Sequence, residues 1–241
     1  MSKVIELELS VPTRMSDITL EQYQKYIKII DKIEEQTEES ANFVNLKALE
    51  IFCGLELRES YKLPMSSFSE IISSLTDALT EDTPLVKKFW FRGSNGVEVE
   101  FGMIPDLQNI SFGEYIDLEN YVSDWSNMHK AMAVLFRPIT KHYKELYDIE
   151  EYESSSKYED YMRRMPLNVA LGALVFFYRL GMKLSRYTTD YSLKALSKEE
   201  LSEVERTLLE KNGVGINQFM QSLEEMSQNL MKLPKNHYTS V

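Results

Sequence analysis

Two passages of the chain share one pattern, VPTRMSDITLEQY (Val11–Tyr23) and IPDLQNISFGEY (Ile104–Tyr115). In each, a proline follows an alternating apolar segment, and a short polar linker leads to a hydroxyl residue and then a tyrosine. The segment before the first passage, Lys3–Val11, alternates apolar and polar residues, which is typical of a half-buried strand. Proline ends such a strand because it cannot donate a ladder hydrogen bond. The pattern therefore predicts two places where a strand gives way to a helix.

The helix starts are predicted by a capping box in each passage. Thr19 is followed three residues later by Gln22, and Ser111 by Glu114, so each hydroxyl can accept from the third helical amide while the longer side chain reaches back to the cap. Apolar residues flank both boxes at staple positions: Ile18 with Tyr23, and Ile110 with Tyr115. Convergence on the same capping chemistry is favoured over internal duplication, because the likeness covers only about a dozen residues.

The remaining patterns predict a mostly helical α+β protein. The segments Lys87–Arg92 and Val97–Phe101 flank Gly93–Gly96 as in a β-hairpin, which with Lys3–Val11 would give a small three-stranded antiparallel sheet. We expect this sheet to pack on about eight helices. They include Phe43–Cys53 ended by Gly54, a helix capped by Ser67 and Glu70, Trp125–Phe136 broken by Pro138, a short amphipathic piece Ile139–Tyr147, Leu167–Arg186 after Pro166, and a helix capped by Ser197 and Glu200.

The most apolar helix is predicted to be the centre of this body. The run Leu167–Tyr178 stops at Arg179 after about twelve residues, whereas a bilayer span needs roughly twenty. A helix that is apolar nearly all round must be covered on every side. Gly172 and Gly181, with Ala170 and Ala173, would let neighbours approach it closely. We expect one domain over residues 1–241. The acidic stretch Asp148–Tyr161, predicted as an exposed loop, is the softest division, between 1–147 and 161–241.

The charge balance disfavours two classes of partner. A formal net charge of −11 argues against nucleic acid and against anionic membranes, because phosphate contact requires a clustered basic surface. Lys87, Lys88 and Arg92 form the nearest thing to a basic patch, and three cations on a hairpin are most simply a solvated surface. Cys53 is the only cysteine, which suits a reducing compartment, and the N-terminal residues lack a signal-peptide core.

No motif predicts catalysis, a cofactor or a metal. The three histidines, His129, His142 and His237, have no second ligand at metal-site spacing, and Cys53 is interpreted as a small buried hydrophobe. The Gly213–Gly215 stretch lacks the rest of a dinucleotide fingerprint, and neither a P-loop nor a nucleophile elbow is present in the sequence. Carboxylates occur as solvated runs, and Glu114 is assigned to its cap.

The last amphipathic helix is the predicted partner-binding segment. Ile216–Leu233 has a Met-rich apolar side and follows Gly213 and Gly215, so it could exchange its own core for a partner's groove. The alternative is that it closes its own chain's core. We predict that this segment, and not the sheet, carries the main contact, through Phe219, Met220, Leu223, Met226 and Leu230.

Several segments resemble small acidic proteins from the structural and tail gene modules of tailed bacteriophages, with those of crAss-like phages of gut Bacteroides and of marine phages most similar. The likeness is carried by Ser16–Ile29, Glu50–Leu55, Phe101–Ile139 and Met165–Gly181.

The resemblance implies a role in the virion or in its assembly, with other phage structural or tail proteins, or the chain itself, as partners. Two forms are open: a virion-associated tail or cargo component, or a tail assembly chaperone that stays in the host cytoplasm. A small hydrolase or nucleotide-binding regulator is the remote alternative. The resemblance carries over no catalytic or ligand residues.

Overall fold

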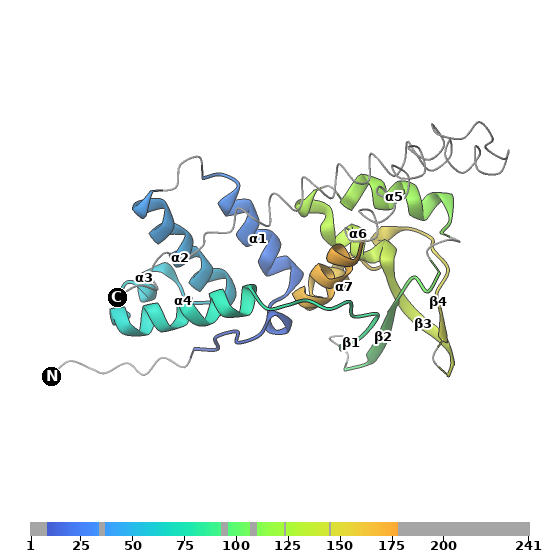
Figure 1. The fold of residues 1–241 in the computed structure, drawn as a ribbon, viewed down its shortest axis with the longest axis horizontal. Coiled ribbons are helices and arrows are strands. Elements are labelled where there is room, and N and C mark those ends of the chain that lie inside the picture. The colour runs from blue at the N-terminus through green and yellow to red at the C-terminus, as the bar shows by residue number, and fades with distance from the viewer. Residues whose placement is uncertain are drawn as a thin grey trace, which may run out of the picture.

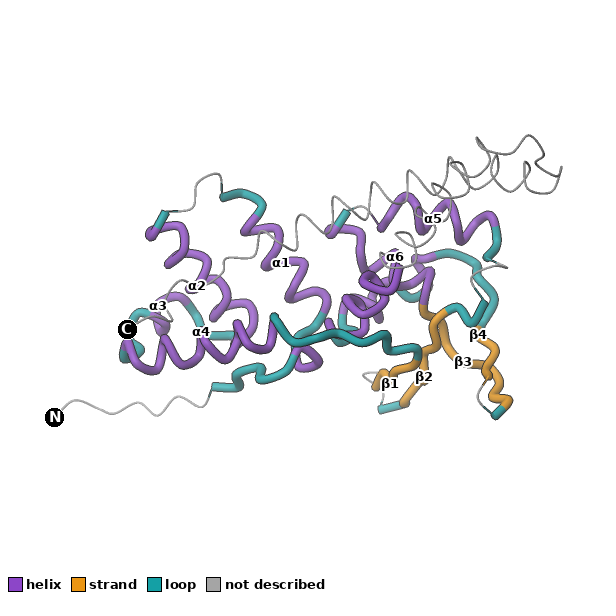
Figure 2. Tube along the Cα trace, viewed as in Figure 1, coloured by secondary structure: helices purple, strands orange, loops and turns teal. Residues whose placement is uncertain are grey.

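The computed structural model describes residues 9–33, 37–92, 96–106, 110–122, 124–144 and 146–177. These residues form an α+β fold, with helices α1–α4 at one end and the sheet at the other (Figures 1 and 2). The helices are α1 (Leu20–Ile30), α2 (Glu38–Cys53), α3 (Leu57–Ser60), α4 (Met65–Leu79), α5 (Phe112–Val122), α6 (Met128–Leu135) and α7 (Glu159–Arg163). Residues 167–177 are also helical. Three short 3₁₀ turns are η1 (Met15–Asp17), η3 (Trp125–Asn127) and η4 (Ser155–Lys157).

The capping boxes predicted in the two similar passages are confirmed. The Thr19 hydroxyl accepts from the Gln22 amide at 3.2 Å, and Gln22 Oε1 accepts from the Thr19 amide at 2.9 Å. At α5 the Ser111 hydroxyl accepts from the Glu114 amide at 3.3 Å, and a Glu114 carboxylate oxygen accepts from the Ser111 amide at 2.7 Å. Reciprocal bonds of this kind satisfy amides that the first helical turn leaves without partners.

Two other helix boundaries were predicted with unequal success. α2 ends before Gly54, whose φ of 68° is left-handed, as predicted for a glycine after the last helical residue. The cap predicted at Ser67 is wrong, because α4 begins two residues earlier, at Met65 after Pro64. Pro64 is the N-cap residue, and its carbonyl accepts from the Phe68 amide at 3.0 Å. Its missing N–H costs no bond, because an N–H at the start of a helix has no acceptor within the helix.

Over the described residues the sheet has four antiparallel strands in the order β1-β2-β3-β4, so the prediction of three strands is wrong. The strands are β1 (Lys88–Arg92), β2 (Glu98–Met103), β3 (Phe136–Tyr143) and β4 (Leu146–Ile149). The hairpin predicted from Lys87–Arg92 and Val97–Phe101 is confirmed as β1 and β2. Of the predicted N-terminal strand Lys3–Val11, residues 9–11 are not in a strand, and the rest lies outside the described residues.

The β3–β4 hairpin replaces the short amphipathic piece that was predicted for Ile139–Tyr147. Pro138 does not end a helix here, because the helix α6 already stops at Leu135 and Pro138 lies within β3. The Ile104 amide donates to the Leu135 carbonyl at 2.8 Å, so the Phe101–Pro138 pair falls at a non-hydrogen-bonded position of the β2–β3 ladder. The missing proline N–H therefore costs no bond to β2.

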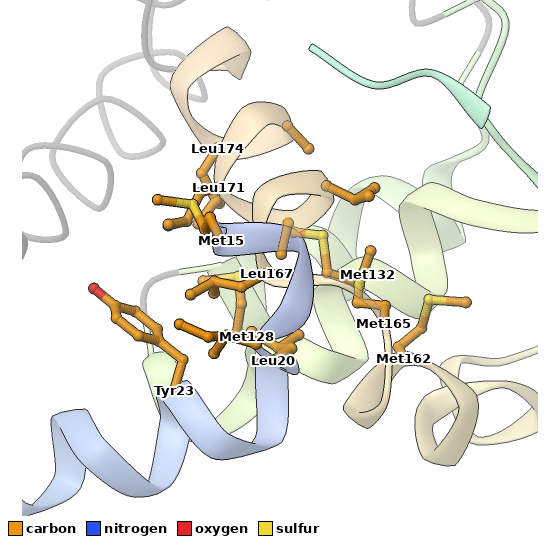
Figure 3. Close-up of a cluster of buried hydrophobic side chains, with 14 of the residues drawn as sticks. Met15, Leu20, Tyr23, Met128, Met132, Met162, Met165, Leu167, Leu171 and Leu174 are labelled. Atoms are coloured by element: carbon orange, nitrogen blue, oxygen red, sulfur yellow. The ribbon is translucent and has the colours of Figure 1, made fainter. Parts of the chain in front are cut away.

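The buried apolar side chains of the described residues form one cluster. Its centre gathers methionines and leucines from η1, α1, α6, α7 and the helix at 167–177 (Figure 3). Seven side chains of that helix are at most 7% exposed, namely Leu167, Val169, Ala170, Leu171, Ala173, Leu174 and Phe177, which confirms the central position predicted for this helix over its described part. Gly172 does permit a close approach, although the neighbour is the extended chain at Pro84 and Leu85 and not a helix.

The acidic stretch Asp148–Tyr161 is only in part the exposed loop that was predicted. It contains the end of β4, the turn η4 and the start of α7. Tyr158 packs edge-on against Phe101 with ring centroids 5.5 Å apart, and its hydroxyl donates to Glu150. The aromatic residues of this stretch, which a charge count overlooks, therefore anchor it to the sheet. Among the described residues, no helix is both long and apolar enough to cross a bilayer.

Candidate functional site

β1 is held in place by the residues on its inner face. Phe89 stacks on Phe101 of β2 with ring centroids 5.6 Å apart and meets Phe136 of β3 edge-on at 5.5 Å. Phe91 meets Tyr161 edge-on at 5.2 Å and lies under the Arg164 guanidinium at 5.0 Å. Aromatic pairs of this geometry bury a large apolar area and fix ring orientation. The inner face therefore fixes β1 at the end of the sheet.

The outer face of β1 presents three exposed side chains at alternate positions, Lys88, Trp90 and Arg92. Trp90 is 63% exposed, which is unusual for the largest side chain in proteins. On the neighbouring strand Glu98 lies opposite Arg92 and Glu100 lies opposite Trp90. Arg92 Nη2 and Glu98 Oε1 are 2.9 Å apart, so this pair is formed in the open solvent, where it contributes little stability.

Tyr147 of β4 holds the two hairpins together. Its hydroxyl donates to the Met103 carbonyl at 2.8 Å, and the Lys87 carbonyl oxygen lies 3.3 Å from the same hydroxyl, so the ring spans the width of β2. Gly102 leaves room for this ring, because a Cβ there would lie 2.5 Å from Cε2 of Tyr147. Lys88 Nζ lies 5.8 Å from the centroid of the same ring. The outer face is therefore a fixed surface in which β4 reaches across to β1.

A buried ion pair joins the sheet to α5. Arg137 Nη2 of β3 lies 2.6 Å from Glu114 Oε1, and both side chains are less than 10% exposed. Burial raises the pKa of Glu114, but the hydrogen bonds from Ser111 and Arg137 outweigh it and hold the pKa below its usual value. The Arg137 guanidinium also lies 5.4 Å from the ring centroid of Tyr152, whose hydroxyl donates to Asp117. Glu114 is therefore a fixed anion that positions β3 against α5.

The sequence-predicted chemical residues are dispersed. His129 is buried on α6, where its Nδ1 lies 3.2 Å from the side-chain nitrogen Nε2 of Gln24. His142 is exposed on β3, and its Nε2 lies 3.0 Å from Oε2 of Glu100. Burial lowers the pKa of His129 to about 4, with the nearby charges of Arg163 and Lys130 adding to the effect. Cys53 is half-buried at the end of α2, and burial raises the pKa of its thiol to about 11. His237 lies outside the described residues.

The described residues include no group of three His, Cys, Asp or Glu side chains that could hold a metal ion. The five residues of the predicted partner-binding segment, Phe219, Met220, Leu223, Met226 and Leu230, also lie outside the described residues. Their assignment stays a prediction.

Sequence reasoning missed two residues of the sheet. The exposure of Trp90 could have been found, because in the alternation of Lys88–Arg92 it shares a face with the two cations and not with the phenylalanines. The pairing of Arg137 with Glu114 had no local signal, since the two are 23 positions apart and meet only through the β3–α5 packing.

The comparisons with known proteins add no relative to this picture. No family model, no curated protein and no solved structure matches the chain.

Proposed function

We propose that this is a non-enzymatic bacteriophage protein that acts by binding other structural or tail proteins of the particle. The observation that carries the proposal is the exposure of large apolar side chains on both hairpins: Trp90 at 63%, Val97 at 54%, Tyr143 at 51% and Leu146 at 71%. Isolated exposed apolar residues are ordinary on protein surfaces. Four of them fall on the two hairpins of one sheet, with Trp90 on the edge strand itself, and this density of exposed apolar side chains favours contact with another protein.

The ionisation states of the buried groups support a binding role over a catalytic one. Glu114 is an anion committed to a helix cap and an ion pair. His129, with a pKa of about 4, takes up no proton near neutral pH, and Cys53, with a pKa of about 11, stays a thiol. General acid–base work requires groups that titrate near the working pH, and nucleophilic cysteines require a lowered pKa.

The phage assignment rests on the sequence resemblance. Its longest segment, Phe101–Ile139, spans the end of β2, the helices α5 and α6 and the start of β3, and its other long segment, Met165–Gly181, begins the central helix. Association with the finished virion, as a tail or cargo component, is our first proposal. A tail assembly chaperone that leaves before completion is the second. Both act through protein contacts.

Mass spectrometry of purified virions and of assembly intermediates from infected cells distinguishes the two forms. Peptides of this chain at structural-protein abundance in gradient-purified particles are the expected result. Their absence from particles, together with co-purification of the chain with tail proteins from infected cells, would make it the chaperone. Hydrolysis of a nucleotide or an ester by the pure protein, abolished by a single side-chain substitution, would overturn both.

The sequence prediction that Ile216–Leu233, and not the sheet, carries the main contact names a competing site, and it has its own test. Replacing Phe219 and Leu223 with Ala should abolish partner binding while the melting temperature of the isolated protein stays unchanged. If the helix closes its own core, the same changes should destabilise the protein by about 2–5 kcal/mol for each large-to-small substitution. Thermal melting and partner pull-down on the same preparation decide between these results.

A further inference from the structure

The backbone of β1 has one paired edge and one open edge. In the part of the chain that the structure describes, β1 pairs only with β2 and ends the sheet. The Met103 amide donates to the Lys87 carbonyl at 2.8 Å, which makes these residues a hydrogen-bonded pair. Since such pairs alternate along an antiparallel ladder, the amides of Phe89 and Phe91 face β2, whereas the backbone groups of Lys88, Trp90 and Arg92 face outward. β1 therefore offers a row of donors and acceptors to a further strand.

The side chains of the same three residues distinguish this edge from a merely protected one. Proteins often blunt an open edge with lysine or arginine, and Lys88 and Arg92 could serve only that purpose. Trp90 lies between them and is 63% exposed. A large apolar side chain at this position would favour contact with another chain, whereas a charged one would discourage it. Tryptophan and arginine are the residues most enriched among the energetically dominant residues of protein interfaces.

The chemistry of the missing strand can be read from the neighbour that β1 already has. β2 places Glu98 and Glu100 opposite Arg92 and Trp90 on the outer face. On the inner face it places apolar residues, Val99 and Phe101, opposite Phe91 and Phe89. Because both edges of a strand share its two faces, the open edge of β1 favours the same alternation of acidic and apolar residues.

We propose that the open edge of β1 docks an extended segment of a partner protein in which acidic residues alternate with apolar ones. This inference rests on the proposed protein-binding function and specifies the chemistry of one contact. A second copy of this chain fits poorly. Its β2 is already flanked by β1 and β3, and pairing of two β1 strands centred on Trp90 would set Lys88 against Arg92. Like charges directly opposite each other destabilise a strand pair.

A peptide with the sequence of residues 96–103, GVEVEFGM, is the probe, because it reproduces the strand that β1 already accepts. Its matched control, GVKVKFGM, has lysine at both acidic positions. Isothermal titration calorimetry of the full chain with each peptide should show saturable binding of GVEVEFGM and about tenfold weaker binding of GVKVKFGM. A third peptide carries N-methyl groups on the amides of both of its edges, so that neither edge can donate to β1. It should not bind, since strand addition requires the backbone amides.

Variants of the protein locate the contact. Trp90→Ala and Lys88→Glu should each weaken binding of GVEVEFGM by about tenfold or more. Lys88→Glu should in turn improve binding of GVKVKFGM. Lys32→Glu, which makes the same charge change at an exposed position beyond the end of α1, should leave both affinities unchanged. All three sites are exposed, so each variant should melt close to the temperature of the wild type, as surface substitutions usually do.

Three results would overturn the inference: no saturable binding of GVEVEFGM, equal binding of the lysine peptide, or full binding of the N-methylated peptide. Self-association of the protein that Trp90→Ala abolishes would also overturn it, because the occupant would then be a second copy. If GVEVEFGM does not bind but mass spectrometry finds the protein abundant in purified virions, this contact is excluded and the proposed function still stands.

Discussion

At the scale of single residues, His129 gives this protein a distinct response to acid. It is 2% exposed, and its Nε2 has no hydrogen-bond partner among the residues that the structure describes. The folded-state pKa of about 4 lies below the ordinary value of 6.5, so the fold favours the neutral imidazole. The stability that this preference contributes is complete above pH 6.5 and is lost as the pH falls from 6.5 towards 4.

We predict that the free energy of unfolding falls by about 2 kcal/mol between pH 7 and pH 5 through this one histidine. Urea denaturation at the two pH values measures the change. His129→Gln should remove most of the difference, because glutamine can still bond Gln24 but does not titrate, whereas His142→Gln, at an exposed site, should retain it. Equal pH dependence in the wild type and in His129→Gln would contradict the assignment.

At the scale of elements, two helical glycines should respond in opposite ways to the same added methyl group. A Cβ at Gly172 would lie 2.5 Å from the carbonyl oxygen of Pro84, which is backbone and cannot rotate away. A Cβ at Gly113, near the start of α5, would meet nothing within 4 Å. The first position therefore sets how closely the 167–177 helix approaches the chain before β1.

Gly172→Ala should destabilise the protein by about 1–3 kcal/mol, the usual cost of overpacking a well-packed core. Gly113→Ala should stabilise it, by at most about 1 kcal/mol, because alanine loses less backbone entropy in a helix. Chemical denaturation of both variants beside the wild type gives the comparison. A neutral Gly172→Ala would show that the helix and the segment at Pro84 separate more easily than their contact indicates.

The sequence predicted helix starts better than strands, for a physical reason. A capping box is complete within four residues, so Thr19 with Gln22 and Ser111 with Glu114 could be recognised without knowing the fold. Pro138 is the opposite case. Whether it ends a helix or lies in a strand depends on the β2 residue opposite it, which only the folded chain brings there. The exposure of Trp90 was within reach of the alternation, while the Arg137–Glu114 pair was not.

At the scale of the whole molecule, a helical body presents a small sheet at one end (Figure 1). The body and the sheet share one core. The ion pair between β3 and α5 fixes the sheet against a helix, and the Tyr147 hydroxyl joins the two hairpins of the sheet. A partner strand that joined β1 would therefore meet a preformed edge, and little of its binding free energy would be spent on ordering this protein. Strand addition at β1 requires this edge to be open in the free protein and paired in the complex.

Residue-resolved amide hydrogen exchange along β1 tests this claim most directly. In the free protein, the amides of Phe89 and Phe91 should exchange slowly because they face β2, while those of Lys88, Trp90 and Arg92 should exchange quickly. Saturation with GVEVEFGM, and then with a partner protein found in virions, should slow the three outward amides and leave the inward two unchanged. Slow exchange at all five positions in the free protein, or no slowing in either complex, would contradict the account.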